Sequence, residues 1–316
     1  MEPDSRIYIA GHRGLVGSAL VRCCEGRAFR GLILRERAEL DLRDAAAVER
    51  FFAAEAPEYV FLAAATVGGI HANDVRPADF IRDNLLIAAN VIDAAWRHHA
   101  AKLLFLGSSC IYPRLAPQPL REDYLLSGPL EPTNEWYAIA KLAGLKMCQA
   151  YRRQHGFDAI TLLPTNLYGP QDNFDLDSSH VLPALLRKID TARRTGADRV
   201  TLWGSGTPLR EFLFVDDLAD ACLFLMQHYS DERPINVGCG QDLSIRELAE
   251  LIAAVVDFRG RFELDPTRPD GTPRKLLDVS RLSALGWHPR IDLATGIRLT
   301  WEWYCRHVVT GLTSVA

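Results

Sequence analysis

The sequence predicts an α/β protein in which a doubly wound parallel sheet is followed by a smaller α/β lobe. Short apolar runs rich in β-branched residues alternate with longer amphipathic segments from residue 6 to about residue 165. Glycines at three-residue spacing follow the first of these runs, where a βαβ unit turns from strand to helix. In a chain of 316 residues, 48% hydrophobic residues are ample for a buried core. Together these observations indicate a sheet of the Rossmann type with right-handed crossovers.

The first half of the chain holds the expected strands of this sheet and the helices that connect them. The strands are short apolar runs of the kind that parallel sheets bury on both faces, and they cover residues 6–10, 31–35, 59–63, 102–107 and 159–164. The helices repeat apolar residues at every third and fourth position, and they cover residues 15–25, 44–55, 77–98 and 137–155.

The second half has more Pro, Gly and Asp and shorter apolar runs. Its expected strands cover residues 199–203, 210–215, 233–238 and 261–265, and an expected helix covers residues 244–257. We assign residues 1–170 to the large sheet and residues 171–316 to the smaller lobe. Because no repeat or flexible linker separates the two, the boundary is gradual, and the lobes are expected to exchange segments beside a ligand-binding cleft.

Charge and cysteine content exclude several classes of protein. The formal net charge of −4 gives no positive field that would draw the chain to nucleic acid or to an anionic membrane. The longest weakly polar stretch, residues 59–70, is too short to span a bilayer, and no secretion signal is visible. The seven cysteines lack a CxxC spacing, which indicates reduced thiols in the cytoplasm and neither a disulfide framework nor a metal site.

The glycine-rich segment after the first strand indicates a phosphate ligand. Gly11, Gly14 and Gly17 lie between an apolar strand and an amphipathic helix, so backbone N–H groups and the helix N-terminus can face a pyrophosphate. Glycines at such a turn also serve close packing alone, but their place at the first strand of a βαβ series favours dinucleotide binding. The expected contacts of this loop come from Gly11, His12, Arg13, Gly14, Leu15, Val16 and Gly17.

The end of the second strand decides which dinucleotide is bound. NAD-binding proteins place an acid there on the ribose 2′-hydroxyl, whereas an arginine accommodates the 2′-phosphate of NADP. Arg37, assisted by Arg13, favours NADP because a guanidinium binds phosphate in a bidentate manner. Glu36 opposes this interpretation unless it points to solvent. Asp41 and Leu42 are expected near the adenine, with a helix cap as the alternative role for Asp41.

A tyrosine and a lysine one helical turn apart form the candidate catalytic pair. Tyr137 and Lys141 project from one face of an expected helix, and the ammonium is expected to lower the pKa of the phenol. Ser108, at the end of the fourth strand, lies where ligands of open α/β sheets bind. Ketone reduction needs a proton donor at the carbonyl oxygen, which suits this tyrosine, and Ser108 is expected to orient the carbonyl. Cofactor contacts are expected from Leu106, Gly107, Ser108, Ser109 and Lys141.

Longer segments extend these signals over most of the chain, from residue 10 to about residue 282. They are GHRGLVGSA, AAATVGGIHAN, FLGSSCIYP, LEPTNEWYAIAK, LPTNLYGPQDNF, SHVLPALLRK, WGSGTPLREFLFVDD and PDGTPRKLLDVSRL. Together they resemble the extended short-chain dehydrogenase/reductase family and, within it, the GDP-L-fucose synthases. The resemblance implies NADP(H) as cofactor and a GDP-sugar as substrate. It also implies conversion of GDP-4-keto-6-deoxy-D-mannose to GDP-L-fucose by 3,5-epimerisation followed by 4-keto reduction.

The resemblance further implies roles for residues that spacing alone does not single out. Cys110 and His180 match the family's pair for epimerisation, in which one group removes a proton from a carbon beside the ketone and the other returns one on the opposite face. By itself, Cys110 would be a small buried residue, and His180 would be a surface residue or a helix start. Cofactor contacts implied by the resemblance are Pro164, Asn166, Leu167 and His180.

The smaller lobe is expected to hold the GDP-sugar. Lys188, Arg210 and Lys275 are candidate cations for its diphosphate, with ordinary solvated charges as the alternative. Trp203 is expected to pack on the sugar or the base, unless it is a core residue at a strand end. Asp270 is expected to accept a hydrogen bond from a hydroxyl or the guanine edge, unless it is a turn residue.

Two positions depart from the family pattern. Thr66 stands where lysine is common, and Trp136 stands where proline is common. Both are expected to border the sugar pocket. The alternative function is therefore a 4-reductase, or a C5-epimerase/4-reductase, acting on a related GDP-4-keto-deoxysugar of the colitose or deoxyheptose type. A non-catalytic NADP-binding regulatory protein is a further alternative, which the complete set of Ser108, Tyr137 and Lys141 argues against.

The resemblance also bears on assembly. Members of the family often pair through two long helices, and residues 77–98 and 137–155 have apolar positions suited to such contacts. A homodimer with a four-helix interface is therefore expected.

Overall fold

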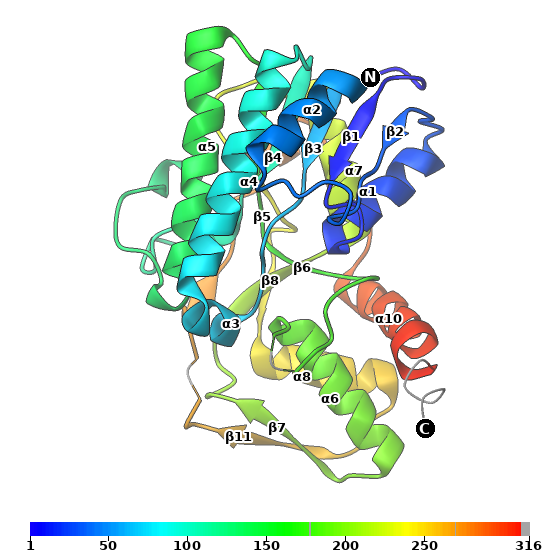
Figure 1. Ribbon diagram of the computed structural model, residues 1–316. Coiled ribbons are helices and arrows are strands. Elements are labelled where there is room, and N and C mark those ends of the chain that lie inside the picture. Colours follow the sequence, from blue (N-terminus) through cyan, green and yellow to red (C-terminus); the bar gives the residue numbers. More distant parts are fainter. Residues whose placement is uncertain (177, 269, 311–316) are drawn as a thin grey trace.

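A six-stranded sheet forms the centre of the larger lobe (Figure 1). The computed structural model describes residues 1–176, 178–268 and 270–310. The strand order is β2-β1-β3-β4-β5-β9, and every pair in it is parallel. The strands are β1 (Ile7–Ala10), β2 (Leu32–Ile33), β3 (Tyr59–Leu62), β4 (Lys102–Leu106), β5 (Ala159–Pro164) and β9 (Ile235–Val237). The predicted doubly wound parallel sheet is thereby confirmed.

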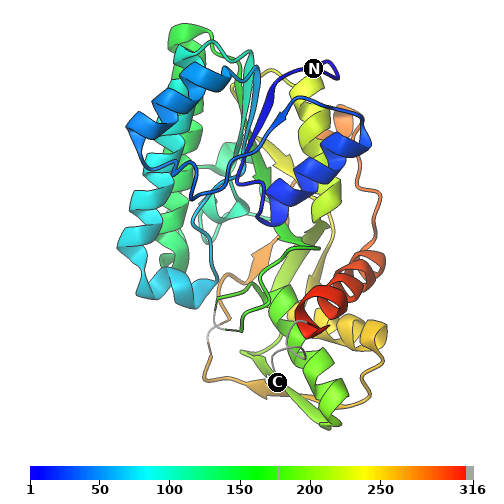
Figure 2. The same ribbon diagram turned by 45° about the vertical axis from the view of Figure 1, so that its right-hand side comes forward.

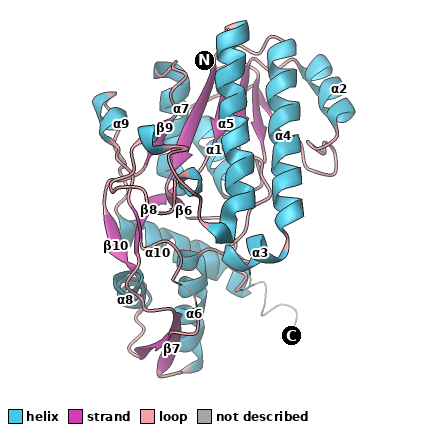
Figure 3. Cartoon of the chain, turned by 90° about the vertical axis from the view of Figure 1, so that its left-hand side faces the viewer, coloured by secondary structure: helices cyan, strands magenta, loops and turns pink. Residues whose placement is uncertain are grey.

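Helices cover both faces of this sheet, α1 and α7 on one side and α2, α4 and α5 on the other (Figures 1 and 3). Their bounds are α1 (Leu15–Gly26), α2 (Ala45–Glu55), α4 (Pro77–Arg97), α5 (Glu135–His155) and α7 (Val215–His228), with a short α3 (Ile70–Val75) before α4. Because successive strand residues point to opposite faces, Ile7 and Ile9 enter the core beneath α1 and α7, whereas Tyr8 enters the core beneath α2 and α4. None of the helices in the described ranges has a stretch long and apolar enough to cross a membrane.

The smaller lobe lies at the carboxyl edge of the sheet, away from the N-terminus (Figure 2). One of its sheets has the order β10-β8-β12, with β6 also paired to β8, and the other pairs β11 with β7. Helices α6, α8 and α10 pack around these strands. The strands are β6 (Asn166–Tyr168), β7 (Arg199–Trp203), β8 (Leu209–Phe214), β10 (Asp242–Ser244), β11 (Arg261–Asp265) and β12 (Arg274–Lys275). The helices are α6 (Val181–Thr195), α8 (Ile245–Val256) and α10 (Leu293–Tyr304), and a short α9 (Ser280–Ala284) packs beside β9.

The chain crosses between the lobes more often than one boundary near residue 170 implies. Residues 233–238 were expected in the smaller lobe, but β9 pairs with β5 at the edge of the large sheet, with Ile235 opposite Leu162. The reason is burial, since Ile235, Asn236 and Val237 are all inaccessible to solvent. The amide of Asn236 is satisfied there, because it accepts a hydrogen bond from the Tyr112 hydroxyl at 2.6 Å and donates to the Leu120 carbonyl at 2.8 Å.

Candidate active site

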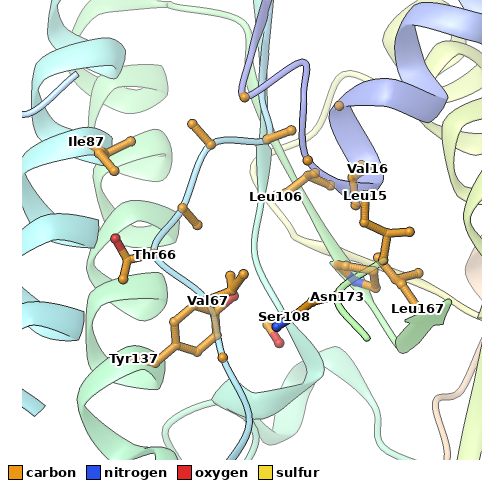
Figure 4. A pocket seen from close by; sticks show the side chains of 18 of the residues that line it. Leu15, Val16, Thr66, Val67, Ile87, Leu106, Ser108, Tyr137, Leu167 and Asn173 are labelled. Carbon is orange, nitrogen blue, oxygen red and sulfur yellow. The ribbon is translucent and has the colours of Figure 1, made fainter. Parts of the chain in front are cut away.

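A pocket of about 540 Å³ opens at the carboxyl ends of β1, β3, β4 and β5 (Figure 4). The strand order reverses between β1 and β3, which is where open α/β sheets bind their ligands. All the predicted catalytic and cofactor residues except His12 and Arg13 line this pocket. Figure 4 shows Ser108 and Tyr137 toward one end of the pocket and Leu15 and Val16 toward the other.

In the glycine loop, the backbone of Gly11, Gly14 and Gly17 lines the pocket without side chains in front of it. Gly14 is the N-cap of α1 and offers no side chain to the first N–H groups of that helix, so these groups stay available to a ligand. Gly11 has a φ of +83°, and a Cβ on Gly17 would lie 2.0 Å from the Gly11 oxygen, so both glycines are required by the turn itself. A Cβ on Gly14 would meet only that same oxygen, at 3.5 Å. This arrangement fits the pyrophosphate of a dinucleotide.

Substituting Gly17 by Ala is expected to destabilise the protein by about 3 kcal/mol, because the added methyl group collides with backbone that cannot move aside. The affinity for NADPH should also fall, by roughly tenfold or more, because the turn that orients the backbone N–H groups toward the phosphates must widen. Chemical denaturation and fluorescence titration with NADPH measure the two effects. Gly14→Ala is the matched control and should keep nearly full stability; equal stability of the two variants would contradict this account.

Arginines surround the end of the pocket beside β2, but they differ in their partners. Arg13 forms an ion pair with Glu36, and Arg35 forms one with Glu55. Glu36 does not line the pocket, whereas Arg37 does. Among the described residues no hydrogen bond or ion pair is found for the Arg37 guanidinium, which leaves it available to a phosphate.

Asp41 also lines the pocket, and a second arginine holds it there. Arg43 donates to Asp41 from Nε at 2.9 Å and from Nη2 at 2.6 Å, and these hydrogen bonds lower the pKa of Asp41 to about 2. Asp41 is not the cap of the next helix, because Asp44 accepts the N–H groups that begin α2. Arg43 lines the pocket as well. Sequence reasoning missed it because a further arginine in a charged segment has no distinguishing signal.

The reductase set is assembled from β4 and α5. Lys141 donates to the Leu106 carbonyl at 2.8 Å, and its Nζ lies 5.7 Å from the centre of the Tyr137 ring. Burial lowers the pKa of Lys141 to about 8. The net lowering of the Tyr137 pKa that was expected from this lysine is not found: burial, together with the charge of Cys110, raises the pKa of the phenol despite a hydrogen bond with Ser108. Tyr137 is therefore protonated at neutral pH, which is the form a proton donor needs.

Cys110 lies in the single turn that follows β4, beside the same serine. Its backbone N–H donates to Ser108 Oγ at 3.2 Å, and Lys275 Nζ lies 3.3 Å from its sulfur. Burial opposes ionisation of the thiol, but the charge of Lys275 and hydrogen bonds with Ser108 and Lys275 outweigh it and lower the pKa of Cys110. His180 lines the pocket just before α6 and remains accessible. Desolvation, and then the charge of Lys275, lower the pKa of its imidazole.

The five residues expected to bind the GDP-sugar lie outside this pocket. Lys188 and Arg268 each lie 4.7 Å from the centre of the Trp203 ring, which is 47% exposed, so the tryptophan is not a core residue. Arg268 is a neighbour that sequence reasoning missed. Desolvation, and then the charge of Arg268, lower the pKa of Lys188.

Asp270 is engaged in a turn, the alternative role considered for it. Its carboxylate accepts the Ser205 N–H at 2.8 Å and the Ser205 hydroxyl at 2.9 Å, while its backbone oxygen accepts from Arg210 at 3.4 Å. Burial lowers the pKa of Arg210. Lys275, expected at the diphosphate, instead has its ammonium on the Cys110 sulfur.

The two departures from the family pattern have different surroundings. Thr66 lines the pocket, and its backbone is held by Asn84, which accepts the Thr66 N–H and donates to the Thr66 carbonyl, both at 2.9 Å. Trp136 does not line the pocket and is 42% exposed. The expectation that Trp136 borders the sugar pocket stays a prediction, because the residues expected to bind the sugar lie outside this cavity. Trp136 directly precedes Tyr137 on α5, and neighbouring positions of a helix point in different directions.

Asp172 is another pocket residue that sequence reasoning did not single out. One of its carboxylate oxygens is buried without a hydrogen-bond partner among the described residues, and burial raises its pKa to about 7. The segment PQDNF belongs to one of the motifs that carry the family resemblance, and no feature of the sequence shows that this aspartate turns inward.

This fold and this site define a dinucleotide-dependent oxidoreductase of the extended short-chain dehydrogenase/reductase class. A family model described as the NAD dependent epimerase/dehydratase family matches residues 7–238. Putative GDP-L-fucose synthase 2 of Arabidopsis thaliana is 60% identical over 309 residues, which cover 98% of this chain and 94% of that protein. The GDP-L-fucose synthase of Escherichia coli K12 is 54% identical over 308 residues, covering 95% and 96%.

Solved structures agree with these matches. The GDP-mannoheptose C4 reductase of Campylobacter jejuni, with NADP bound, is 40% identical with a TM-score of 0.88, covering 96% of this chain and 99% of that one. The chain belongs to the NAD dependent epimerase/dehydratase family and, within it, to the GDP-L-fucose synthases.

Proposed function

We propose that this enzyme converts GDP-4-keto-6-deoxy-D-mannose to GDP-L-fucose by 3,5-epimerisation and NADPH-dependent reduction at C4. One observation carries the proposal: Ser108, Cys110 and Tyr137 line the same pocket, where Ser108 Oγ accepts the Cys110 N–H at 3.2 Å. A substrate ketone whose oxygen is bound at Ser108 is therefore within reach of Tyr137. The sugar carbons on either side of that ketone then face the thiol of Cys110. The 60% and 54% identical relatives bear the name of this activity.

The epimerisation uses the acidity of the carbons beside the ketone. The thiolate of Cys110 takes a proton from such a carbon, and the electron pair left behind moves to the carbonyl oxygen, where Ser108 and Tyr137 stabilise the enolate. His180 then returns a proton on the opposite face. Its lowered pKa makes the imidazolium a stronger acid toward the enolate, and its accessibility lets it take up another proton from solvent.

The reduction follows at the same oxygen. NADPH supplies a hydride to C4 when it is bound. Tyr137, which is protonated at neutral pH, donates its proton to the oxygen as it becomes a hydroxyl, and Ser108 orients that oxygen. Lys141, anchored on the Leu106 carbonyl, places a positive charge beside the phenol as it loses its proton.

The smaller lobe supplies the groups for GDP. Trp203, with Lys188 and Arg268 around it, offers an aromatic surface for a base and two cations for phosphate oxygens. Arg210 links the smaller lobe to Cys110. Its guanidinium donates to the Asp270 backbone oxygen, and it interacts electrostatically with the thiol of Cys110.

NADPH preference follows from Arg37, which lines the pocket, while Glu36 turns away to Arg13. Arg37→Ala is expected to weaken NADPH binding by roughly thirtyfold, the equivalent of about 2 kcal/mol for a charged hydrogen bond to phosphate. NADH binding should change little, because NADH lacks the 2′-phosphate. Fluorescence titration measures both affinities. Arg30→Ala, which removes an exposed guanidinium paired with Asp4, is the control, and equal losses for NADPH and NADH would reject this role.

Assembly and location are part of the proposal. Two copies pair through α4 and α5, which lie side by side on the outer face of the larger lobe (Figure 3). Each of these helices is 21 residues long, long enough for a four-helix interface. The enzyme works in the cytoplasm, a location that the seven free cysteines support. Analytical ultracentrifugation tests the dimer.

The deciding experiment supplies GDP-4-keto-6-deoxymannose and NADPH in deuterated water. The proposal is supported if NADPH is oxidised and if NMR of the product finds deuterium at both C3 and C5. Reduction without exchange would assign the enzyme to the C4 reductases, as the 40% identical relative is named. Deuterium at C5 alone would assign it to a C5-epimerase/4-reductase. The absence of any turnover would reject an enzymatic role with this sugar.

A further inference from the structure

The ammonium of Lys275 lies inside the catalytic constellation. Its Nζ is 3.3 Å from the sulfur of Cys110, and its charge also acts on His180. One cation thus faces both groups of the proposed epimerisation pair. This position differs from the role expected for Lys275, which was to bind the diphosphate.

The fold fixes this lysine from both sides of its strand. β12 runs parallel to β8, with Lys275 opposite Arg210, so the two cationic side chains project from the same face of the sheet. The Gln118 side chain holds the backbone on either side of Lys275, donating to the Arg274 oxygen at 3.1 Å and accepting the Leu276 N–H at 3.0 Å. These hydrogen bonds fix the backbone of β12, and the Lys275 ammonium therefore lies beside the Cys110 sulfur.

The remaining groups near the thiol come from the other elements packed around it. Arg210 on β8 adds a second positive charge, and Ser108 at the end of β4 adds a hydrogen bond. Tyr137 on α5 is protonated and carries no charge. Desolvation, and then the charge of Lys275, lower the pKa of His180, which precedes α6. Lys275 therefore places a positive charge 3.3 Å from the sulfur.

The other buried cysteines of the chain show what happens without such a cation. Burial raises the pKa of Cys148 to about 12, and burial together with the charge of Cys23 raises that of Cys24 to about 12. Cys110 is partly buried and burial opposes its ionisation too, yet its pKa shifts in the opposite direction, with Lys275 as the largest favourable cause. Enclosure alone would leave Cys110 as a neutral thiol at neutral pH.

We infer that Lys275 is a positioning residue that holds Cys110 as a thiolate and thereby makes Cys110 the base of epimerisation. This inference rests on the proposed function for its catalytic consequence, but the state of the thiol is measurable without any substrate. In the proton-transfer step the sulfur–hydrogen bond forms as the carbon–hydrogen bond breaks, and the electron pair passes to the carbonyl oxygen. Lys275 loses no proton and touches no substrate in this step.

The first test follows alkylation of Cys110 by iodoacetamide as a function of pH, with the modified peptide quantified by mass spectrometry. The midpoint in the unmodified protein is expected below the ordinary thiol value of about 8.5. In Lys275→Met it should move up by about one pH unit or more, so that alkylation at pH 7 slows by roughly tenfold. Lys275→Arg keeps a charge and should lie between the two. Lys275→Gln is a second neutral variant that serves if the methionine variant fails to bind NADPH.

A matched control separates this effect from the loss of any lysine. Lys146 is exposed on α5, and its ammonium donates to Gln149 at 3.0 Å. Lys146→Met should leave the alkylation profile unchanged. An unchanged profile in both neutral variants of Lys275 would overturn the inference, whatever happens to activity.

The second test separates the two half-reactions. Solvent deuterium exchange into the keto sugar reports on epimerisation, whereas oxidation of GDP-L-fucose by NADP⁺ needs the reductase set alone. Lys275→Met should slow exchange by roughly tenfold at pH 7 and recover with rising pH, while GDP-L-fucose oxidation and the KM for the GDP-sugar stay close to their original values. A raised KM with an unchanged alkylation profile would make Lys275 a diphosphate ligand instead. If the unmodified enzyme neither exchanges nor oxidises these sugars, the proposed function fails, but the alkylation result still decides the state of Cys110.

Discussion

Replacing Tyr137 by Phe is expected to slow 4-keto reduction by about three orders of magnitude, within the range of a lost general acid. The phenylalanine keeps the ring but removes the proton that must reach the carbonyl oxygen. Deuterium exchange beside the ketone should continue at a reduced rate, because Ser108 still stabilises the enolate and Cys110 still carries its Lys275 partner. NADPH absorbance measures the first activity, and NMR in deuterated water measures the second.

A simple control distinguishes lost chemistry from lost structure. NADPH should bind to the Tyr137→Phe variant with nearly unchanged affinity, because the glycine loop and Arg37 lie at the other end of the pocket from the phenol. Loss of exchange in proportion to loss of reduction would show that the phenol serves both steps equally, and the proposed division of labour would then fail.

Replacing Cys110 by Ser is expected to have the converse result. A serine hydroxyl does not ionise at neutral pH, so proton removal beside the ketone should slow by about a thousandfold, as for a lost general base. The hydroxyl is smaller than the thiol and leaves Tyr137, Ser108 and Lys141 in place, so the variant should still reduce a 4-keto sugar. The expected product retains the original configuration at the neighbouring carbons, which NMR of the product identifies.

Cys305→Ser is the matched control, because Cys305 is a free cysteine beyond α10, outside the pocket. It should retain both activities. If Cys110→Ser instead produced normally epimerised sugar, the base would have to be another group, and His180 would be the first to examine.

The sequence predicted most of the residues that line the pocket near the glycine loop and the strand ends, because local patterns determine their positions. The three-residue spacing after a strand identifies Gly11, Gly14 and Gly17 as a phosphate-loop candidate. The four-residue separation of Tyr137 and Lys141 places both side chains on one helix face. The strand ends bearing Ser108 and Asn166 then meet at one edge because parallel strands share a direction. These inferences require only short-range geometry and a known sheet type.

The remainder depends on contacts between distant segments. Lys275 reaches Cys110 across 165 positions of sequence, through the pairing of β12 with β8 and the hydrogen bonds of Gln118. The pKa of Tyr137 was misjudged because the sequence shows the neighbouring lysine but not the burial that outweighs it. β9 was misplaced because a three-residue strand carries no signal of which sheet it joins.

The placement of β9 and α7 has a consequence for the chain as a folding unit. A fragment ending near residue 170 would leave the edge of β5 without its partner strand and would expose the apolar surface of α1 that α7 covers. The dinucleotide-binding half therefore cannot serve as a transferable module. We therefore expect an exchange of sugar specificity to succeed by replacing side chains and loops within an intact chain, because β9 and α7 from the second half complete the larger lobe.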